Sequence, residues 1–301
     1  MSDFVQQQNS ICDFATSDSW VILSPIEQSI KMKIESVGTP LKDWDINIYR
    51  GVLTGCNEAF IIDSGKREEI LANCQTEDER QRTAELIRPI LRGRDIKRYG
   101  YVDNGLYLIN THNGVRGRIP RINIEDYPAV KAHLDQYWDR IATRADKGDT
   151  PYNLRNCAYL EDFNKPKVVY MEIQTDNPEE GYPFPCYSYD DKRCVVLNTA
   201  YIMSSETLDP RYVLGILNSR LGKFLVKLYV TQLQERQFRM LSQYVMKFPI
   251  ARPTREQEKE MTHLVQDILV NKSIASENRI DELAFQIYKL SEQETKILIS
   301  R

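Results

Sequence analysis

Apolar residues recur every three or four positions in some stretches of the chain and form short unbroken runs in others. Ile26, Ile30 and Ile34 continue a Ser24-Pro25-Ile26-Glu27 segment that is typical of a capped helix start, and Gly38 ends that helix. Runs rich in Val, Ile, Tyr and Phe predict strands at Ile46–Tyr49, Ala59–Ile62, Leu106–Ile109, Lys167–Ile173 and Val195–Met203. The pattern therefore predicts a mixed α/β (α+β) fold.

Two amphipathic stretches predict helices within this α/β part. The first runs from Asp126 to Lys147, and its shared apolar face consists of Val130, Leu134, Trp138 and Ile141. The second opens at Asp209-Pro210 and carries an apolar stripe from Val213 to Leu228. The opposite face of this second helix carries Asn218, Arg220, Lys223 and Lys227.

After Pro249 the pattern becomes purely helical. Thr254-Arg255-Glu256-Gln257 is a capping box that opens a helix through Leu269, Ile280–Ile287 marks another, and Ser291 to Glu294 caps a last one. We therefore expect three parts: a polar linker or tail at 1–20, an α/β body at 21–250 and a helical C-terminal extension at 251–301.

The composition is that of an ordinary globular chain, with 42% hydrophobic and 28% charged residues among 301. No apolar run approaches the roughly 18–20 residues that a membrane helix needs, so no membrane partner is expected. Met1 to Ser10 lacks a secretion signal, and the six cysteines form no Cys-x-x-Cys pair. These features predict reduced thiols, no bound metal and a cytoplasmic location.

The net charge of −3 does not indicate a nucleic-acid partner, but cations cluster in two segments. Residues 81–121 hold nine Lys or Arg against three carboxylates, and residues 215–247 hold six against one. An acidic protein with concentrated basic segments can present one positive face to a polyanion. Solvated surface is the alternative interpretation of each segment.

No recognisable catalytic motif is present. The chain has no Walker loop, no Gly-x-Gly-x-x-Gly, no His-Glu-x-x-His and no Gly-x-Ser-x-Gly, and Asn177-Pro178-Glu179-Glu180 departs from the Asn-Pro-Pro-aromatic sequence of adenine methyltransferases. Asp162 with Glu172-Ile173-Gln174 is similar to a divalent-metal nuclease pattern, but Gln174 replaces the usual lysine. A metal-dependent nuclease and a protein-interaction scaffold therefore remain as alternative functions, and whether the chain is an enzyme stays open.

Several motifs follow one another in a fixed order along the chain. They are Arg50–Asp63, Ile90–Tyr99, Tyr152–Arg155, Phe163–Tyr170, Leu214–Leu221, Phe248–Ile250 with Gln257–Lys259, and Ile280–Leu283 with Ile287–Leu290 and Glu294. Together these motifs resemble the TaqI-like C-terminal specificity domain (target recognition domain) of type IIG restriction-modification enzymes and adenine-specific DNA methyltransferases. The resemblance spans roughly Trp20 to the end of the chain. Cys56 stands where the family usually has another residue.

This resemblance implies a non-catalytic domain that reads a short double-stranded DNA sequence for a methyltransferase or endonuclease module, in cis or in trans. In the resembled enzymes S-adenosylmethionine binds a separate methyltransferase domain, which also flips out the target base. Because that domain is missing here, we expect no cofactor in this chain. We also expect the chain to be a fragment, an expressed domain or a separately encoded specificity polypeptide.

The DNA-binding residues expected from the sequence lie in turn-rich segments with suitable donors. Arg92, Arg94, Lys97 and Arg98 surround a glycine, and Arg116 and Arg118 flank another, although Arg94 and Asp95 can instead form an internal ion pair. Thr54 and Asn57 lie in a turn between two strands, where Asn57 either reads adenine or caps the turn. Tyr152 and Arg155 can stack on and bond to the nucleic-acid backbone, although Tyr152 can equally lie in the core. The last candidates, Gln234, Gln237 and Arg239, suit base edges but equally suit an exposed helix face.

Overall fold

The computed structural model describes residues 23–177, 183–234 and 236–300, and the chain divides into two compact units. We call Ile48–Glu172 with Ser188–Ser204 the sheet unit, and Met1–Asn47, Ile173–Tyr187 and Ser205–Arg301 the helical unit. The expected tail at 1–20 and the segment Pro178–Glu180 lie outside the described residues. None of the helices in the described part is long and apolar enough to cross a membrane.

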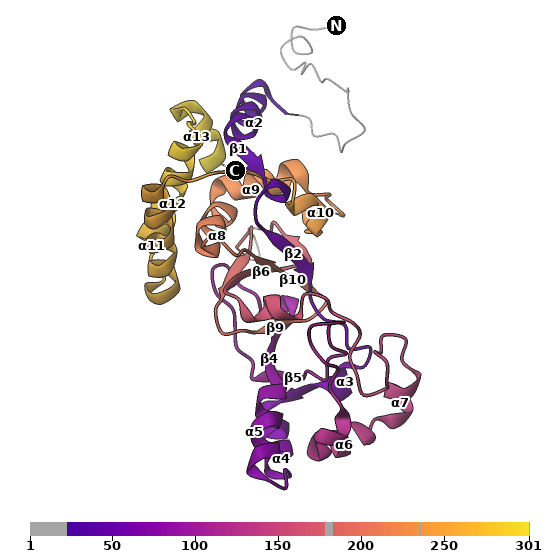
Figure 1. Cartoon of the computed structure of the whole chain (residues 1–301). Helices are drawn as coiled ribbons and strands as arrows, with labels where there is room; N and C mark the ends of the chain where they lie inside the picture. The colour runs from indigo at the N-terminus through magenta and orange to yellow at the C-terminus, as the bar shows by residue number, and fades with distance from the viewer. Residues whose placement is uncertain (1–22, 178–182, 235, 301) are drawn as a thin grey trace, which may run out of the picture. The chain divides into compact units, whose positions relative to one another are not determined.

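One sheet of the sheet unit has the order β3-β5-β4-β9 (Figure 1). Its strands are β3 (Ile61–Asp63), β5 (Leu106–Ile109), β4 (Ile87–Leu91) and β9 (Val195–Val196). β5 is antiparallel to both β3 and β4, whereas β9 runs parallel to β4 with Ile90 opposite Val195. Branched side chains dominate these strands because they pack well on a pleated surface.

A second sheet has the order β2-β10-β6-β8. It contains β2 (Asn47–Arg50), β10 (Ala200–Ser204), β6 (Lys167–Met171) and β8 (Tyr187–Asp190). β10 and β6 are antiparallel, with Ile202 opposite Val169, and all five residues of β10 are buried. A strand without a solvent-facing side is expected to be an unbroken apolar run, as this one is in the sequence.

Short helices cover the sheets of this unit. They are α3 (Asn57–Phe60), α4 (Ser64–Ala72), α5 (Glu77–Leu86), α6 (Pro128–Asp135) and α7 (Trp138–Thr143), with 3-10 turns η2 (Gly93–Asp95), η3 (Ile124–Asp126) and η4 (Leu160–Asn164). Phe60, Val130, Leu134 and Ile141 reach from them into one core that also contains Phe163. Loops and short turns connect these elements, and they carry most of the candidate site residues of this unit.

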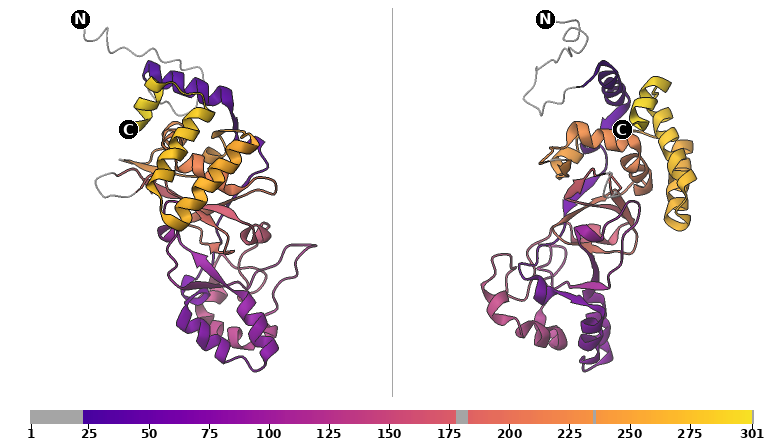
Figure 2. Two further views of the ribbon diagram at one scale, coloured as in Figure 1. Left: turned by 90° about the vertical axis from the view of Figure 1, so that its left-hand side faces the viewer. Right: turned by 180° about the vertical axis from the view of Figure 1, so that it is seen from behind.

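The helical unit is built from seven helices in its described residues, with two small β-ribbons. The helices are α2 (Pro25–Val37), α8 (Pro210–Asn218), α9 (Arg220–Tyr229), α10 (Ser242–Val245), α11 (Arg255–Asn271), α12 (Ile274–Ile287) and α13 (Glu292–Ile299), with the 3-10 turn η1 (Leu41–Asp43). α11 packs side by side with α12 and against α8 (Figure 2). Gly215 permits this close approach, because a Cβ there would lie 2.3 Å from the Met261 sulfur.

One ribbon of this unit pairs β1 (Gly38–Pro40) with β12 (Pro249–Ala251) in antiparallel register. Tyr288 of the α12 C-terminus bonds to β12 as well, since its hydroxyl donates to the Pro249 carbonyl at 2.9 Å and accepts the Ala251 N–H at 2.8 Å. The Tyr212 hydroxyl donates to the Ala251 carbonyl. The C-terminal helices are thereby tied to the strand that precedes them.

Several sequence predictions are confirmed and others need correction. The capping boxes at Ser24, Thr254 and Ser291 are present. The expected strand at Ala59–Ile62 is wrong in its first half, which is the helix α3. The expected helix from Asp126 to Lys147 is two helices, and Trp138 is 44% exposed, because α6 ends at Asp135 and the chain turns before α7.

The helix that opens at Asp209 is also interrupted. Ser219 has an extended backbone and caps α9 by accepting the Gly222 N–H. Asn218, expected on a solvent-facing side, is fully buried and bonds to both backbone groups of Tyr187. An amide side chain can donate and accept hydrogen bonds as a neighbouring strand does, so the polarity of Asn218 did not mean that it was exposed.

Candidate nucleic-acid interface

Thr54 and Asn57 form a tight turn before α3. The Thr54 hydroxyl donates to the Asn57 side-chain oxygen at 2.6 Å and accepts the Cys56 N–H at 3.2 Å. Gly55 has a φ of +66°, which a residue with a Cβ adopts only with strain. The turn-capping alternative is therefore present, while the Asn57 side chain stays exposed; its role in reading adenine stays a prediction.

Arg92 is bound to the protein itself. Its guanidinium forms two bonds with the carboxylate of Asp95, at 2.9 and 2.8 Å, and its N–H also donates to this carboxylate. Burial raises the pKa of Asp95, but the bonds from Arg92 outweigh burial and lower it. The alternative left open by the sequence was a pair of Asp95 with Arg94. The pair forms with Arg92 instead, because Arg92 is the N-cap of η2 and Asp95 is the third residue of that turn, where the two form a capping box.

Arg94 and Lys97 are exposed and lack carboxylate partners within the described residues. The Lys97 ammonium donates to the Arg94 carbonyl, and the Arg98 guanidinium lies 5.2 Å from the centre of the Tyr99 ring. A Cβ at Gly93 would lie 2.8 Å from the Thr199 carbonyl, so this turn packs tightly on the chain before β10. The arrangement presents two cations on a fixed turn.

β8 fixes the chain that follows this turn. Ser188 accepts the Lys97 N–H at 3.2 Å, and the Tyr189 N–H donates to the Tyr99 carbonyl at 2.7 Å. Further along β8, Asp190 forms a fully buried ion pair with Lys167. Burial lowers the pKa of Lys167, and the neighbouring Asp190 carboxylate opposes that shift.

The loop with Arg116 and Arg118 is a narrow hairpin. Val115 bridges to Ile119, and Gly114 and Gly117 have φ angles of +74° and +76°. Arg118 forms an ion pair with Glu161, whereas Arg116 is exposed and has no partner among the described residues. The hairpin tip therefore presents one unpaired cation and one in an exposed pair.

Tyr152 and Arg155 are engaged with their neighbours. The Tyr152 hydroxyl donates to Asp135, its ring packs against Trp138 at 5.5 Å, and the Lys131 ammonium lies 5.8 Å from the ring centre. Burial and then the Asp135 carboxylate raise the pKa of Tyr152 to about 12. Arg155 bonds to Asp146 at 3.2 Å but remains exposed. These contacts do not test whether Tyr152 and Arg155 bind the DNA backbone, which stays a prediction.

Three of these candidate segments meet in the sheet unit. We name them the threonine turn (54–57), the arginine hairpin (112–121) and the tyrosine loop (144–156). Hydrogen bonds from Arg144 and Asn153 join them, although the sequence did not point to either residue. No sequence signal distinguishes Arg144, because it lies among ordinary polar residues.

The remaining candidates lie in the helical unit on a two-stranded antiparallel ribbon, β7 (Ile173–Thr175) with β11 (Gln237–Arg239). The sequence allowed a helix face here, but the segment is a strand. Register places Gln237 opposite Thr175 and Arg239 opposite Ile173, so these four side chains share one face of the ribbon. Phe238 and Gln174 lie on the buried face.

Gln234 lies in the connection before β11, where its carbonyl accepts the Gln237 N–H at 3.0 Å, and its side chain is exposed. Ile173 is 47% exposed, which the sequence did not predict for a strand end. A two-stranded ribbon of this kind fits the major groove of B-DNA. The predicted readers are thus divided between the two units, and each group is described here by itself.

The cations of 215–247 are largely used inside the helical unit. Lys223 and Lys227 both bind the carboxylate of Asp176, at 3.1 and 2.9 Å, and Arg220 bonds to Asp281. Burial raises the pKa of Asp176, but the two lysines outweigh it and lower that pKa. All three cations therefore have carboxylate partners within the helical unit, although Arg220 stays exposed.

The residues of the nuclease-like pattern have structural partners. Asp162 accepts bonds from Ser204 and Lys165, and Glu172 pairs with Arg50 at 2.7 Å. The Gln174 amide bonds to both backbone groups of Cys186. Among the described residues, no group of three or more His, Cys, Asp or Glu side chains is arranged to hold a metal ion.

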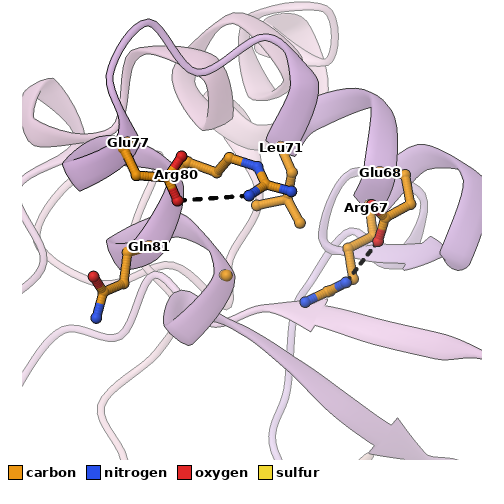
Figure 3. A pocket seen from close by; sticks show the side chains of 7 residues that line it. Arg67, Glu68, Leu71, Glu77, Arg80 and Gln81 are labelled. Atoms are coloured by element: carbon orange, nitrogen blue, oxygen red, sulfur yellow. Dashed lines mark hydrogen bonds and ion pairs between the residues drawn. The ribbon is translucent and has the colours of Figure 1, made fainter.

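A shallow pocket of about 300 Å³ lies between α4 and α5 (Figure 3). Two ion pairs line this pocket, one between Arg67 and Glu68 and one between Arg80 and Glu77. The remaining lining residues are Leu71, Gln81 and Ala84. The mixed charge of this wall does not favour a polyanion.

The mixed α/β fold and the exposed basic turns agree with the class of protein expected from the sequence, a DNA specificity domain. Residues 88–250 match the family of TaqI-like C-terminal specificity domains, and the chain belongs to this family. The chain is also 24% identical over 296 residues to the type II methyltransferase M.BstVI of Geobacillus stearothermophilus, an alignment that covers 95% of this chain. It spans about half of that relative, 47% of its length.

Two solved structures share the fold. The type IIL restriction-modification enzyme MmeI, in complex with DNA, superposes on 87% of this chain with a TM-score of 0.58 and 12% identity. The type IIG restriction endonuclease BpuSI superposes on 88% with a TM-score of 0.51 and 12% identity. The chain matches 37% and 33% of these longer proteins. The expected fold class, that of a specificity domain with C-terminal helices, is confirmed.

Proposed function

We propose that this chain reads a short sequence of double-stranded DNA and positions a methyltransferase or endonuclease module on it. The observation that carries the proposal is the set of cations without carboxylate partners on fixed turns of the sheet unit, Arg94, Lys97 and Arg116. Loops on a rigid scaffold are where recognition usually resides. Cations supply affinity and register through phosphates, and a few base contacts supply specificity.

The chemistry in this proposal belongs to a module outside the chain, joined to it in cis or in trans. The relative M.BstVI is named as a methyltransferase and extends well beyond the aligned part, which supports such a module. S-adenosylmethionine is accordingly assigned to the module, and the action is placed in the cytoplasm with the DNA. Residues 21–250 are proposed to read DNA, with residues 251–301 as a helical extension and 1–20 as a linker.

The test measures duplex binding by fluorescence anisotropy over a range of potassium chloride concentrations. Each phosphate contact contributes about 0.9 to the slope of log affinity against log salt, so several contacts give a steep fall. A flat response between low and moderate salt contradicts the proposal. Duplex binding that survives neutralisation of the basic turns would favour the interaction-scaffold alternative.

A second measurement tests the division of chemistry. Calorimetric titration of the chain with S-adenosylmethionine is expected to give no binding heat, because the sequence has no glycine-rich cofactor loop. Micromolar binding of the cofactor would contradict the assignment of chemistry to a separate module.

A further inference from the structure

Arg144 is a buried cation that joins two loops of the sheet unit. It follows α7, is 7% exposed, and donates from Nη1 to the Thr54 carbonyl at 3.0 Å and from Nη2 to the Asn153 carbonyl. Its guanidinium carbon lies 4.2 Å from the centre of the Phe60 ring. Burial lowers the pKa of Arg144 to about 10, so the side chain remains charged at neutral pH. Its two bonds link the threonine turn to the tyrosine loop.

Asn153 joins the tyrosine loop to the base of the arginine hairpin. It is 1% exposed, and its amide donates to the Ile122 carbonyl at 2.9 Å and to the Thr111 carbonyl at 3.4 Å. Its side-chain oxygen accepts the Thr150 hydroxyl at 2.7 Å. The amide therefore has partners on both sides of the hairpin, just outside His112 and Arg121.

Both side chains bind main-chain carbonyls of neighbouring loops, at Thr54 and Asn153 for Arg144 and at Thr111 and Ile122 for Asn153. The pairs they bridge are far apart in sequence, since Thr54 precedes Arg144 by 90 positions and Thr111 precedes Asn153 by 42. A buried cation is an expensive way to stabilise a core, because well-packed apolar residues often do as well or better. Arg144 also leaves its Nε without a partner in the described residues. These contacts are therefore better explained as fixing the geometry of the loops than as adding to the stability of the core.

We propose that Arg144 and Asn153 are positioning residues for base reading, which hold the threonine turn, the arginine hairpin and the tyrosine loop in one arrangement that matches duplex DNA. This inference rests on the proposed function and deepens it. Neither side chain touches DNA, since both are buried. They act through the exposed residues of the loops, Asn57, Arg116, Arg118 and Arg155.

The test selects duplexes from a pool with a randomised central segment, using the full chain, and then measures affinities for the best duplex, its single-base variants and unrelated DNA. The main variant is Arg144→Lys, which keeps the charge but loses the two-pronged donor geometry. We expect discrimination against single-base changes to fall about tenfold, within the range that one bidentate base contact supplies. Affinity for unrelated DNA and its salt slope stay at the wild-type values.

The matched control is Arg88→Lys. Arg88 is a half-buried arginine of the same unit, and it donates to the Arg193 carbonyl at 2.6 Å, outside the three loops. The milder variant Thr150→Val removes only the hydroxyl that orients the Asn153 amide. It is expected to lower discrimination in the same direction by a smaller factor, and it decides the question if Arg144→Lys does not fold by circular dichroism.

The outcomes separate the two proposals. Unchanged discrimination in folded Arg144→Lys, or in Thr150→Val where Arg144→Lys does not fold, overturns the positioning role and leaves the proposed function intact. Equal losses of specific and non-specific affinity in the Arg144 and Arg88 variants show a merely structural role and also overturn it. A wild-type chain that enriches no sequence overturns the proposed function, and the positioning role with it.

Discussion

The basic segments 81–121 and 215–247 have similar net charge but use their cations in different ways. In the second segment Lys223, Lys227 and Arg220 bind carboxylates of the helical unit itself. In the first segment Arg94 and Arg116 are exposed without carboxylate partners among the described residues, while four other arginines of that segment are paired: Arg82, Arg92, Arg118 and Arg121. A count of charges along the chain treats the two segments as equal, whereas an incoming phosphate meets only the cations that the fold has left unpaired.

The comparison also separates two kinds of candidate reader. The sheet unit presents loops that carry arginines, while the helical unit presents a ribbon face with an amide, an arginine and two branched side chains. Arginine forks suit guanine or phosphate, the amide suits adenine, and methyl groups suit thymine. The four predictions below test whether affinity belongs mainly to the first region and whether the charges of the second mainly stabilise the fold.

The largest effect is expected from the combined substitution Arg94→Gln, Lys97→Gln and Arg116→Gln. If each cation contacts one phosphate, the salt slope becomes shallower by about 2.7, and affinity at low salt falls on the order of a hundredfold. Anisotropy titrations of a duplex at several salt concentrations measure both quantities.

The control for this triple variant replaces three cations at the surface of the same unit that are already paired and are at least partly exposed. Lys66, Arg80 and Arg82 bind Glu69, Glu77 and Asp78, so their change to Gln alters the net charge equally. An equal loss of slope in the control would show that total charge, and not the unpaired turns, governs binding.

A smaller effect, on specificity, is expected from single alanine variants of readers in each region. We expect Arg94→Ala or Arg118→Ala to relax the recognised sequence at one position by about 1–3 kcal/mol, the value of one bidentate base contact. Sequencing of selected duplexes measures this, with Gln237→Ala of the ribbon compared in the same experiment. If only Gln237→Ala relaxes the motif, the ribbon is the reader and the loops contact phosphates.

Glu294 tests the structural use of charge in the helical unit. It is buried and accepts bonds from Lys33 at 2.6 Å, Ser29 at 2.8 Å and the Ser291 N–H at 2.7 Å. Burial raises its pKa, but these donors, led by Lys33, outweigh burial and lower the pKa to about 2. The folded pKa lies below the ordinary value of 4.5, so the stabilisation is complete above pH 4.5 and is lost as the pH falls toward 2.

Glu294→Gln is therefore expected to lower the free energy of unfolding by about 1.5–3 kcal/mol at neutral pH, the range for a hydrogen bond to a charged group. The difference from the wild type shrinks as the pH falls from 4.5 toward 2. Urea titrations at several pH values measure it, with the exposed Glu292→Gln of the same helix turn as control. A difference that does not depend on pH would contradict the assignment.

The smallest effect is expected from Lys223→Gln. It removes one of two cations on Asp176, and a partly exposed pair contributes about 0.2–1 kcal/mol to folding. The salt slope of DNA binding should not change, because this lysine is engaged inside the helical unit. A shallower salt slope in this variant would show that Lys223 contacts DNA phosphates.

Local signals in the sequence predicted much of the secondary structure. The capping boxes and the branched run at 106–109 carry their information within a few residues, and the structure follows them. The expected single strand at 195–203 is wrong, because the chain turns after β9 and enters the other sheet as β10. The breaks at Gln136 and Ser219 were missed because apolar spacing continues across them. At Ser219 the apolar stripe also stays buried on both sides of the break, so the hydrophobic pattern has no gap there.

The sequence predicted which loops and residue types form the candidate site, but not which residues contact one another. Turn residues and arginines indicated the loops, whereas the choice of Arg92 over Arg94 for the Asp95 pair depends on the geometry of η2. Arg144 and Asn153 had no local signal, since their partners lie up to 90 residues away. The pairing of Thr175 with Gln237 likewise depends on a register that only the fold sets.

The Tyr288 hydroxyl on β12 has a consequence for where the chain tolerates being cut. β12 has β1 on one edge, and Tyr288 occupies the N–H of Ala251 and the carbonyl of Pro249. Removing residues 254–301 would bare that edge together with the apolar faces of α8 and α9. An uncovered edge is a template for pairing with further chains, so the shortened protein is expected to self-associate before it loses its affinity for DNA.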